Sequence, residues 1–305
     1  MLTCDQYLMP DTLGTALAQW AGAPPGSRLV AGATDTLPWA RQGRAGDVHV
    51  PHLIDVSKVA ELQGYEISGG RVRLGAGLVL QRFLDDETLK AHLPCMPFCA
   101  VWFADDQIRE QATLAGNIVN ASPAADGTPP MIAMNGTIEL ARLEDGEITR
   151  RTLPLTQFVT GPGATMRGDD EIVTAVECDS MTGYGGSFEK VGQRRSLVIA
   201  TVCTACLVKP SPDKMSFQDV RLAIGGIGPV PLRLTHIEDF LKNRPVTREA
   251  LRQASHMIDG LINSRTRRAY RRSVLSGFIE RALEDALADC GVVILSDSFK
   301  EAVNA

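Results

Sequence analysis

The sequence predicts a fold of mixed α-helices and β-strands that is divided into more than one domain. At 305 residues the chain is long for a single hydrophobic core and suits about two domains. Short strand patterns bounded by glycines alternate with helical patterns up to residue 182. A glycine-rich joint follows at 183–186 (GYGG), after which the strand patterns come first and the helical patterns last.

The first elements indicate a small N-terminal subdomain. Residues 11–20 place their apolar side chains at helical spacing on one face. A short strand at 28–30 leads into a loop of small residues, and 49–56 has the pattern of a second strand. We therefore expect a first subdomain over residues 1–56.

A second subdomain is expected over residues 57–182. Glycines bracket its first short strands, of which Arg71-Val-Arg-Leu74 alternates as a half-buried strand should. The remaining patterns are helices at 80–93 and 99–107 and strands at 137–142, 148–154 and 171–176.

The last part of the chain indicates a third unit over residues 183–291, followed by a tail at 292–305. Its patterns are strands near 187–193, 197–208 and 219–225 and helices near 235–242, 247–260 and 266–289. A partial glycine motif at 74–80 (LGAGLVL) does not indicate a Rossmann fold, because Leu80 occupies the position of its third glycine.

Two runs of small residues are the strongest functional signal. One is 30–35 (VAGATD) and the other is 112–126 (ATLAGNIVNASPAAD). Gly116 permits backbone conformations that a Cβ forbids, and successive N–H groups in such a turn form an anion site suited to a pyrophosphate. Two such loops could hold one dinucleotide from both sides, although either alone could be an ordinary turn.

Four segments together resemble one known family. They are 29–37 (LVAGATDTL), 113–126 (TLAGNIVNASPAAD), 188–194 (FEKVGQR) and 264–272 (SRTRRAYRR). In this order they are similar to the landmarks of the FAD-binding (medium) subunit of molybdenum hydroxylases, the family of xanthine dehydrogenase and carbon monoxide dehydrogenase. The resemblance covers nearly the whole chain.

This resemblance implies an α+β fold of the vanillyl-alcohol-oxidase (PCMH) type. Two FAD-binding subdomains would be followed by a C-terminal α+β domain with a three-stranded antiparallel sheet and a helical bundle. The implied FAD-binding residues are Leu29, Val30, Ala31, Gly32, Ala33, Thr34, Asp35, Thr113, Ala115, Gly116, Asn117, Ser122, Asp126, Ile172, Val173 and Lys190.

The resemblance also implies a role for several of these residues. Both loops would contact the pyrophosphate through backbone N–H and hydroxyl groups, and Asp126 would accept hydrogen bonds from ribose or ribityl hydroxyls. Ile172 and Val173 would pack near the flavin ring. Lys190 would lie near the isoalloxazine and favour a reduced, anionic flavin; the alternative for Lys190 is a solvated strand lysine.

The implied function is that of an electron-transfer subunit with FAD as its own cofactor and no catalytic residue. A large partner subunit would hold the molybdopterin cofactor, and a small partner subunit would hold [2Fe–2S] clusters. Electrons would pass from these clusters through FAD to NAD⁺, oxygen or another acceptor, and the complex would be a dimer of heterotrimers.

Two other functions remain open on the sequence. One is a stand-alone FAD-dependent oxidase of the same fold, and the other is a cofactor-free assembly or scaffold protein. The second draws on Ala33 and Ala115, which stand where the family usually has glycine. A positive φ at either alanine would be costly.

Composition and charge exclude several other classes. A formal net charge of −5 argues against a general nucleic-acid binder, so an ion-paired or subunit-facing surface explains the basic run at 265–272 better than an RNA face does. No apolar stretch is long enough for a membrane span, and the N-terminus lacks a secretory signal, so we expect a cytoplasmic protein with reduced thiols. Cys203 and Cys206 are interpreted as buried strand cysteines, and no metal is expected in this chain.

Overall fold

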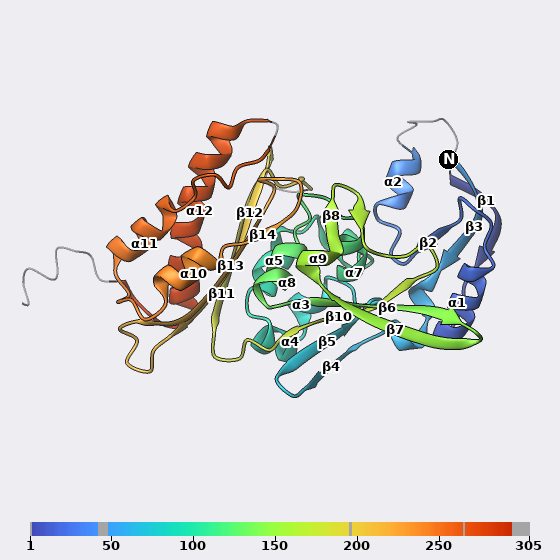
Figure 1. Cartoon of the computed structure of the whole chain (residues 1–305), viewed down its shortest axis with the longest axis horizontal. Helices are drawn as coiled ribbons and strands as arrows, with labels where there is room; N and C mark the ends of the chain where they lie inside the picture. The colour runs from blue at the N-terminus through green and yellow to red at the C-terminus, as the bar shows by residue number, and fades with distance from the viewer. Residues whose placement is uncertain (1, 42–47, 195–196, 265, 295–305) are drawn as a thin grey trace, which may run out of the picture.

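The computed structural model describes residues 2–41, 48–194, 197–264 and 266–294, and these form three successive parts (Figure 1). The first is a parallel sheet in the order β1-β3-β2 with two helices. Its elements are β1 (Leu2–Leu8), α1 (Leu13–Ala21), β2 (Arg28–Val30), α2 (Thr36–Arg41) and β3 (Val48–Asp55). The sequence did not predict β1, because its side chains are mostly exposed and it lacks an apolar alternation.

The second part contains an antiparallel sheet in the order β4-β5-β10-β6-β7. These strands are β4 (Tyr65–Ser68), β5 (Arg71–Gly75), β6 (Thr137–Glu144), β7 (Glu147–Pro154) and β10 (Ile172–Asp179). The helices between β5 and β6 are α3 (Arg82–Asp85), α4 (Glu87–His92), α5 (Met96–Trp102), α6 (Asp106–Arg109), α7 (Leu114–Val119) and α8 (Thr128–Ala133). Short elements complete it: two 3₁₀ turns (Val56–Lys58 and Ala60–Leu62), α9 (Leu155–Phe158), β8 (Val159–Gly161) and β9 (Ala164–Thr165).

The third part is an antiparallel sheet covered by helices. Its elements are β11 (Gly185–Val191), β12 (Val202–Pro210), β13 (Phe217–Gly225), β14 (Leu232–Arg233), α10 (Thr235–Leu241), α11 (Arg248–His256) and α12 (Arg268–Asp289). The sheet has a short fourth strand, β14, beyond the three that were expected, because residues 232–233 pair with Ala223 and Ile224. Cys203 and Cys206 are fully buried on β12, which confirms their interpretation as strand cysteines.

The C-terminal sheet lies between its own helices and the second part of the chain. A Cβ on Gly185 would meet Ala286 of α12, whereas a Cβ on its neighbour Gly186 would meet Pro94 and Cys95. Successive strand residues point to opposite faces, so one face of β11 packs on α12 and the other packs on the segment before α5. Leu207 and Ala223 accordingly join the apolar core of the first two parts, while a separate core fills the space under α12.

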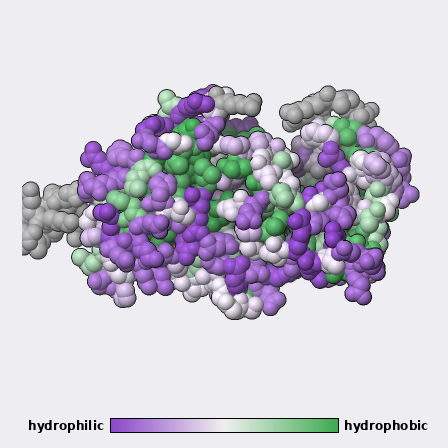
Figure 2. Space-filling view, viewed as in Figure 1, coloured by the Kyte–Doolittle hydropathy of each residue, from purple (hydrophilic) through white to green (hydrophobic). Residues whose placement is uncertain are grey.

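The surface in the view of Figure 1 is mostly polar. Figure 2 shows purple residues over most of this face, with green apolar residues gathered between the C-terminal helices and the centre of the molecule. No helix among the described residues is both long enough and apolar enough to cross a membrane.

Candidate functional site

Two adjoining pockets form one long groove between the first and second parts of the chain, and the C-terminal domain borders one end of it. We call the first the tryptophan pocket (about 310 Å³), because Trp20 lines it, and the second the aspartate pocket (about 580 Å³), because Asp126 lines it. Both are within the range of ligand sites. The two pockets share part of their lining, namely Arg28, Leu29, Val30, Ala31, Thr113, Gly116 and Val119.

The first loop, residues 31–35, forms one wall of the groove. A Cβ on Gly32 would lie 1.8 Å from the carbonyl oxygen of Gln111, so only glycine allows the loop to approach the segment before α7 this closely. Ala33 has φ +52°, which is a left-handed conformation that costs conformational energy in an alanine. Neither Gly32 nor Thr34 forms a hydrogen bond with another described residue, which leaves their N–H groups available to a ligand.

The second segment differs from the expected anion-binding turn, because its centre is the short helix α7. Thr113 caps this helix, and its Oγ1 accepts a hydrogen bond from the Gly116 N–H at 3.0 Å. The Asn117 N–H donates to the Thr113 carbonyl, and the Asn117 Oδ1 accepts from the Gly127 N–H. The N–H groups of Gly116 and Asn117 are therefore both used within the protein, and the contact of these residues with a pyrophosphate stays a prediction.

Ala115 is a normal residue of α7. Its φ is not positive, so alanine in place of the family's usual glycine causes no backbone strain here. Ala115 lines the tryptophan pocket together with Gly116. Ser122 and Asn117 line the aspartate pocket, where the Ser122 Oγ also accepts a hydrogen bond from the Ala124 N–H.

Asp126 is the most distinctive group of the aspartate pocket. Its Oδ2 binds the Lys190 Nζ at 2.5 Å, and both side chains are at least nine-tenths buried. Its Oδ1 is buried and has no hydrogen-bond partner among the described residues. Burial raises the pKa of Asp126 to about 6, although the Lys190 ammonium opposes that rise.

Lys190 is not the solvated strand lysine of the alternative interpretation, because only 1% of its side chain is exposed. Its Nζ donates to Asp126 and to the Trp102 carbonyl oxygen at 3.1 Å. Lys190 lines neither pocket. It therefore lies behind Asp126, and its charge reaches the groove through that carboxylate.

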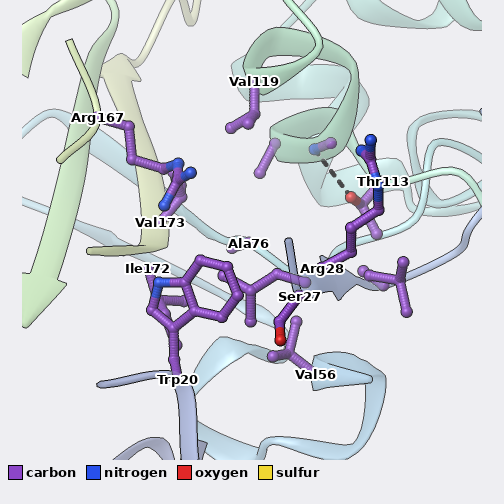
Figure 3. Close-up of a pocket in the computed structure, with 15 residues that line it drawn as sticks. Trp20, Ser27, Arg28, Val56, Ala76, Thr113, Val119, Arg167, Ile172 and Val173 are labelled. Carbon is purple, nitrogen blue, oxygen red and sulfur yellow. Dashed lines mark hydrogen bonds between the residues drawn. The ribbon is translucent and has the colours of Figure 1, made fainter. Parts of the chain in front are cut away.

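Ile172 and Val173, at the start of β10, line the tryptophan pocket with Trp20 and Arg167. Figure 3 shows Arg28 and Arg167 on opposite sides of this pocket, with the Trp20 ring next to Ile172. Asp126 lines only the other pocket. Ile172 and Val173 thus face one end of the groove and Asp126 the other. The two predicted flavin contacts, with Ile172 and Val173 and beside Lys190, lie at different ends of the groove and stay predictions.

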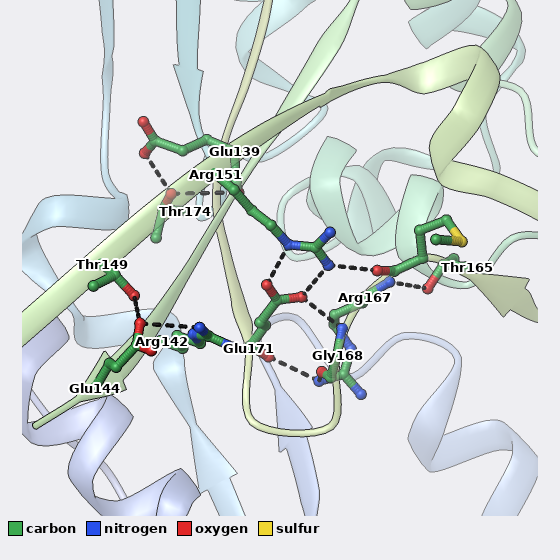
Figure 4. A network of polar contacts seen from close by, with 11 residues as sticks. Glu139, Arg142, Glu144, Thr149, Arg151, Thr165, Arg167, Gly168, Glu171 and Thr174 are labelled. Atoms are coloured by element: carbon green, nitrogen blue, oxygen red, sulfur yellow. Dashed lines mark hydrogen bonds and ion pairs between the residues drawn. The ribbon is translucent and has the colours of Figure 1, made fainter.

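A buried carboxylate fixes the segment that leads into β10. The Arg151 guanidinium binds both oxygens of Glu171, at 2.5 and 2.7 Å, and the Gly168 N–H donates to Glu171 Oε2 (Figure 4). The hydrogen bond from Arg151 is the main reason that the pKa of Glu171 lies below its ordinary value. Arg167 donates to the carbonyl oxygens of Gly168 and Glu171, which holds its side chain beside the pocket.

Several lining residues were not found from the sequence. They are Trp20, Arg28 and Arg167 in the tryptophan pocket and Phe103, Leu197 and Ile199 in the aspartate pocket. Trp20 was predicted only as part of the apolar face of the helix at 11–20. Arg28 begins β2, the strand that leads into the first loop, a position at which a groove-lining side chain could have been anticipated.

The basic run is partly paired in the structure, and its first residue, Arg265, lies outside the described residues. Arg272 forms an ion pair with Asp259, and Arg271 donates to the carbonyl oxygens of Thr201 and Gly226. The Gly226 N–H in turn donates to the Pro123 carbonyl oxygen at 2.8 Å. Arg271 therefore supports a turn of the C-terminal domain that contacts the Asp126 segment.

Comparisons with known proteins agree with this architecture. Residues 3–178 match the family described as the FAD binding domain in molybdopterin dehydrogenase, and residues 187–286 match the CO dehydrogenase flavoprotein C-terminal domain. The chain is 27% identical over 292 residues to the xanthine dehydrogenase FAD-binding subunit of Escherichia coli O157:H7, covering 93% of this chain and 97% of that protein. It is 26% identical over 290 residues to the carbon monoxide dehydrogenase medium chain of Hydrogenophaga pseudoflava, covering 93% and 98%.

Solved structures confirm the fold. A chain of carbon monoxide dehydrogenase from H. pseudoflava aligns with a TM-score of 0.81 at 25% identity, covering 93% of this chain and 98% of that one. A chain of the Cu,Mo-CO dehydrogenase aligns with a TM-score of 0.85 at 23% identity, covering 95% and 99%. The expected PCMH-type fold with FAD as the cofactor is thereby confirmed, and this chain belongs to the family of FAD-binding oxidoreductase subunits of the molybdopterin dehydrogenases.

Proposed function

We propose that this chain is the electron-transfer subunit of a multi-subunit molybdenum hydroxylase. It would receive electrons from [2Fe–2S] clusters of a small partner subunit and deliver them through FAD to NAD⁺, oxygen or another acceptor. In such an enzyme FAD supplies the redox chemistry, while the protein supplies binding, orientation and electrostatics. The family membership of the chain and the relatives' names support this proposal.

The observation that carries the proposal is the set of unused polar groups along the groove. Asp126 Oδ1 is a buried acceptor without a partner, and a ligand hydroxyl would satisfy it. Across the groove, Gly32 and Thr34 have no hydrogen bonds to other described residues. Acceptor and donors thus occur where a ribityl chain and a pyrophosphate of FAD would need them, so the residues present fit this cofactor.

The two pockets differ in their lining residues, and this difference indicates which pocket would bind the adenine and which the isoalloxazine. The tryptophan pocket offers apolar walls from Trp20, Ile172 and Val173, which suit the adenine ring. The aspartate pocket is lined by Asp126, with Lys190 behind it, and opens beside the exposed residues Leu197 and Ile199 of the C-terminal domain. We assign the isoalloxazine to this second pocket, where it would be reachable by a partner.

The partners follow from the same proposal. A large subunit with the molybdopterin cofactor would oxidise the substrate, and the complex would be a dimer of heterotrimers. We propose the C-terminal domain, including residues 266–272, as the docking surface, since Tyr270 is 46% exposed on its first helical turn. The cytoplasmic location stays a prediction.

A visible spectrum of the purified chain tests the flavoprotein function. We expect a yellow protein that releases FAD in a ratio close to one to one. A folded chain that stays colourless and takes up no added FAD would instead support the cofactor-free scaffold.

Native mass spectrometry of material from the source cell tests the subunit function. We expect a complex with one large molybdenum-containing subunit and one small iron–sulfur subunit for each copy of this chain. A free chain that oxidises an organic substrate without partners would favour the stand-alone oxidase.

A further inference from the structure

We infer that Arg28 is the cation that binds the cofactor's pyrophosphate and offsets part of its charge, and that Trp39 positions Arg28. The inference rests on the proposed FAD site and adds two residues to it. Its starting point is an electrostatic deficit in the groove. Bound FAD brings a doubly charged pyrophosphate. Gly32 and Thr34 can offer it only neutral N–H groups, and Gly116 and Asn117 have no free backbone N–H to offer it.

Arg28 lies at the junction of the two pockets. It lines both of them, together with Thr113, Gly116 and Val119 of the facing wall. A cofactor with its adenine in one pocket and its isoalloxazine in the other must place its pyrophosphate at this junction. In Figure 3 the Arg28 side chain extends toward the Thr113 end of α7.

The Arg28 guanidinium is also uncommitted. No hydrogen bond or ion pair joins it to another residue within the described part of the chain. The other charged groups that line the groove are engaged: Asp126 binds Lys190, Asp35 accepts from the Asn120 Nδ2, and Arg167 donates to two carbonyl oxygens. Only the Nη1 of Arg167 is engaged by described residues, but Arg167 lines the tryptophan pocket alone. Arg28 is thus the cation at the junction whose donors are free for two phosphates, which a guanidinium can bind in a bidentate manner.

Trp39 holds this guanidinium in place. The Arg28 Cζ lies 4.5 Å from the centroid of the Trp39 ring, within the range of a cation–π contact. Trp39 belongs to α2, which begins directly after the first loop. The ring therefore restricts the Arg28 side chain before the cofactor binds, so binding costs less side-chain conformational entropy.

FAD titration of the apoprotein at low salt tests both residues. We expect Arg28→Gln to weaken FAD binding by about 10- to 100-fold, the range of a charge-assisted hydrogen bond. Arg28→Lys should recover part of that loss. The gap between wild type and Arg28→Gln should shrink at high salt, because mobile ions screen the pyrophosphate.

Arg252→Gln is the matched control, since it makes the same change at an exposed arginine of α11, far from the groove lining. It should bind FAD as the wild type does. Trp39→Ala should weaken binding less than Arg28→Gln does, and the double variant should bind no worse than Arg28→Gln alone, because Trp39 acts through Arg28.

The outcomes separate this inference from the function on which it rests. A wild-type chain that binds no FAD defeats the proposed function. A wild type that binds FAD while Arg28→Gln stays within twofold of it at every salt concentration overturns only the role of Arg28. If Trp39→Ala adds its full loss on top of Arg28→Gln, the positioning role of Trp39 is overturned. Circular dichroism of each variant confirms that it is folded.

Discussion

Asp126 combines two functions that the protein must balance at a single carboxylate. One oxygen binds Lys190 from the C-terminal domain, and the other stays unpartnered beside the groove. Burying a carboxylate is costly unless a cation compensates for the lost hydration. Lys190 therefore keeps Asp126 able to accept a hydrogen bond from a ligand at neutral pH.

Replacing Lys190 should cause a pH-dependent loss of stability. Burial already raises the pKa of Asp126 from 3.8 to about 6. A carboxyl group whose pKa rises on folding stabilises the folded protein fully at pH values below its ordinary pKa, and this stabilisation is lost as the pH rises through about 6. Lys190→Met removes the opposing charge and raises this pKa further. We expect a loss of about 3–5 kcal/mol at pH 8 and a smaller loss at pH 5, where Asp126 binds a proton.

Urea unfolding at the two pH values measures this difference. Lys90→Met, which removes a lysine from a surface pair with Glu87, is the control and should cost at most about 1 kcal/mol at either pH. An equal loss for Lys190→Met at pH 5 and pH 8 would contradict the coupling to Asp126.

Ala33 and Ala115 should respond in opposite directions to the same substitution. Ala33 adopts φ +52°, so Ala33→Gly relieves a left-handed conformation and should stabilise the protein by about 1 kcal/mol. Ala115 is helical, so Ala115→Gly should destabilise it by about 0.5–1 kcal/mol. Thermal unfolding checks both variants, and a change of the same sign in the two would show that the backbone conformation does not decide the effect.

At the scale of elements, the close contact between the first loop and the segment before α7 shapes the groove. Gly32 approaches Gln111, and the Asn120 Nδ2 donates to Asp35 at 3.0 Å across the same pocket. These contacts join the two walls of the groove, whose residues lie far apart in the sequence. The width of the groove therefore depends on the absence of a single Cβ.

Gly32→Ala should separate the two walls. Its new Cβ would lie 1.8 Å from the Gln111 oxygen, which belongs to the backbone and cannot rotate away. We expect a stability loss of about 1–3 kcal/mol, together with FAD binding weakened at least about tenfold. FAD titration and urea unfolding measure the two effects.

Gly14→Ala is the control for that variant, because a Cβ at Gly14 in α1 meets nothing within 4 Å. It should leave FAD binding unchanged and stabilise the helix by up to about 1 kcal/mol. FAD affinity as high in Gly32→Ala as in Gly14→Ala would mean that the contact between Gly32 and Gln111 does not determine the width of the groove.

At the scale of the whole molecule, the C-terminal domain forms part of the site rather than an independent appendage. Strand β11 carries Lys190 to Asp126, and the loop before β12 supplies Leu197 and Ile199 to the aspartate pocket. The same strand packs on the second part through Gly186, where a Cβ would lie 2.4 Å from the Cys95 nitrogen. Displacing β11 should therefore change both stability and cofactor binding.

Gly186→Ala tests this coupling. We expect it to destabilise the protein by about 1–3 kcal/mol and to weaken FAD binding, although Gly186 lines neither pocket. Gly277→Ala in α12, where a Cβ meets nothing within 4 Å, is the control and should do neither. Unchanged FAD affinity in Gly186→Ala would mean that the position of the domain does not matter to the groove.

The elements with strong periodicity, and the family of the chain, could be predicted from the sequence. The helix that became α1, the strand β2 and the three long strands of the C-terminal sheet follow from local apolar patterns. The four segments indicated the cofactor through their resemblance to the family, because they occur along the chain in the family's order. Strand β1 was not predicted, because its exposed side chains carry no such pattern.

The hydrogen-bond partners and the burial of the site residues followed only from the tertiary structure. Small residues at 113–119 are compatible with both a turn and a helix, and the Thr113 cap together with packing selected the helix. Whether Lys190 is buried depends on Asp126, which lies 64 positions away in the sequence. Pairings of this kind join separate elements, and local sequence patterns do not encode the distance between them.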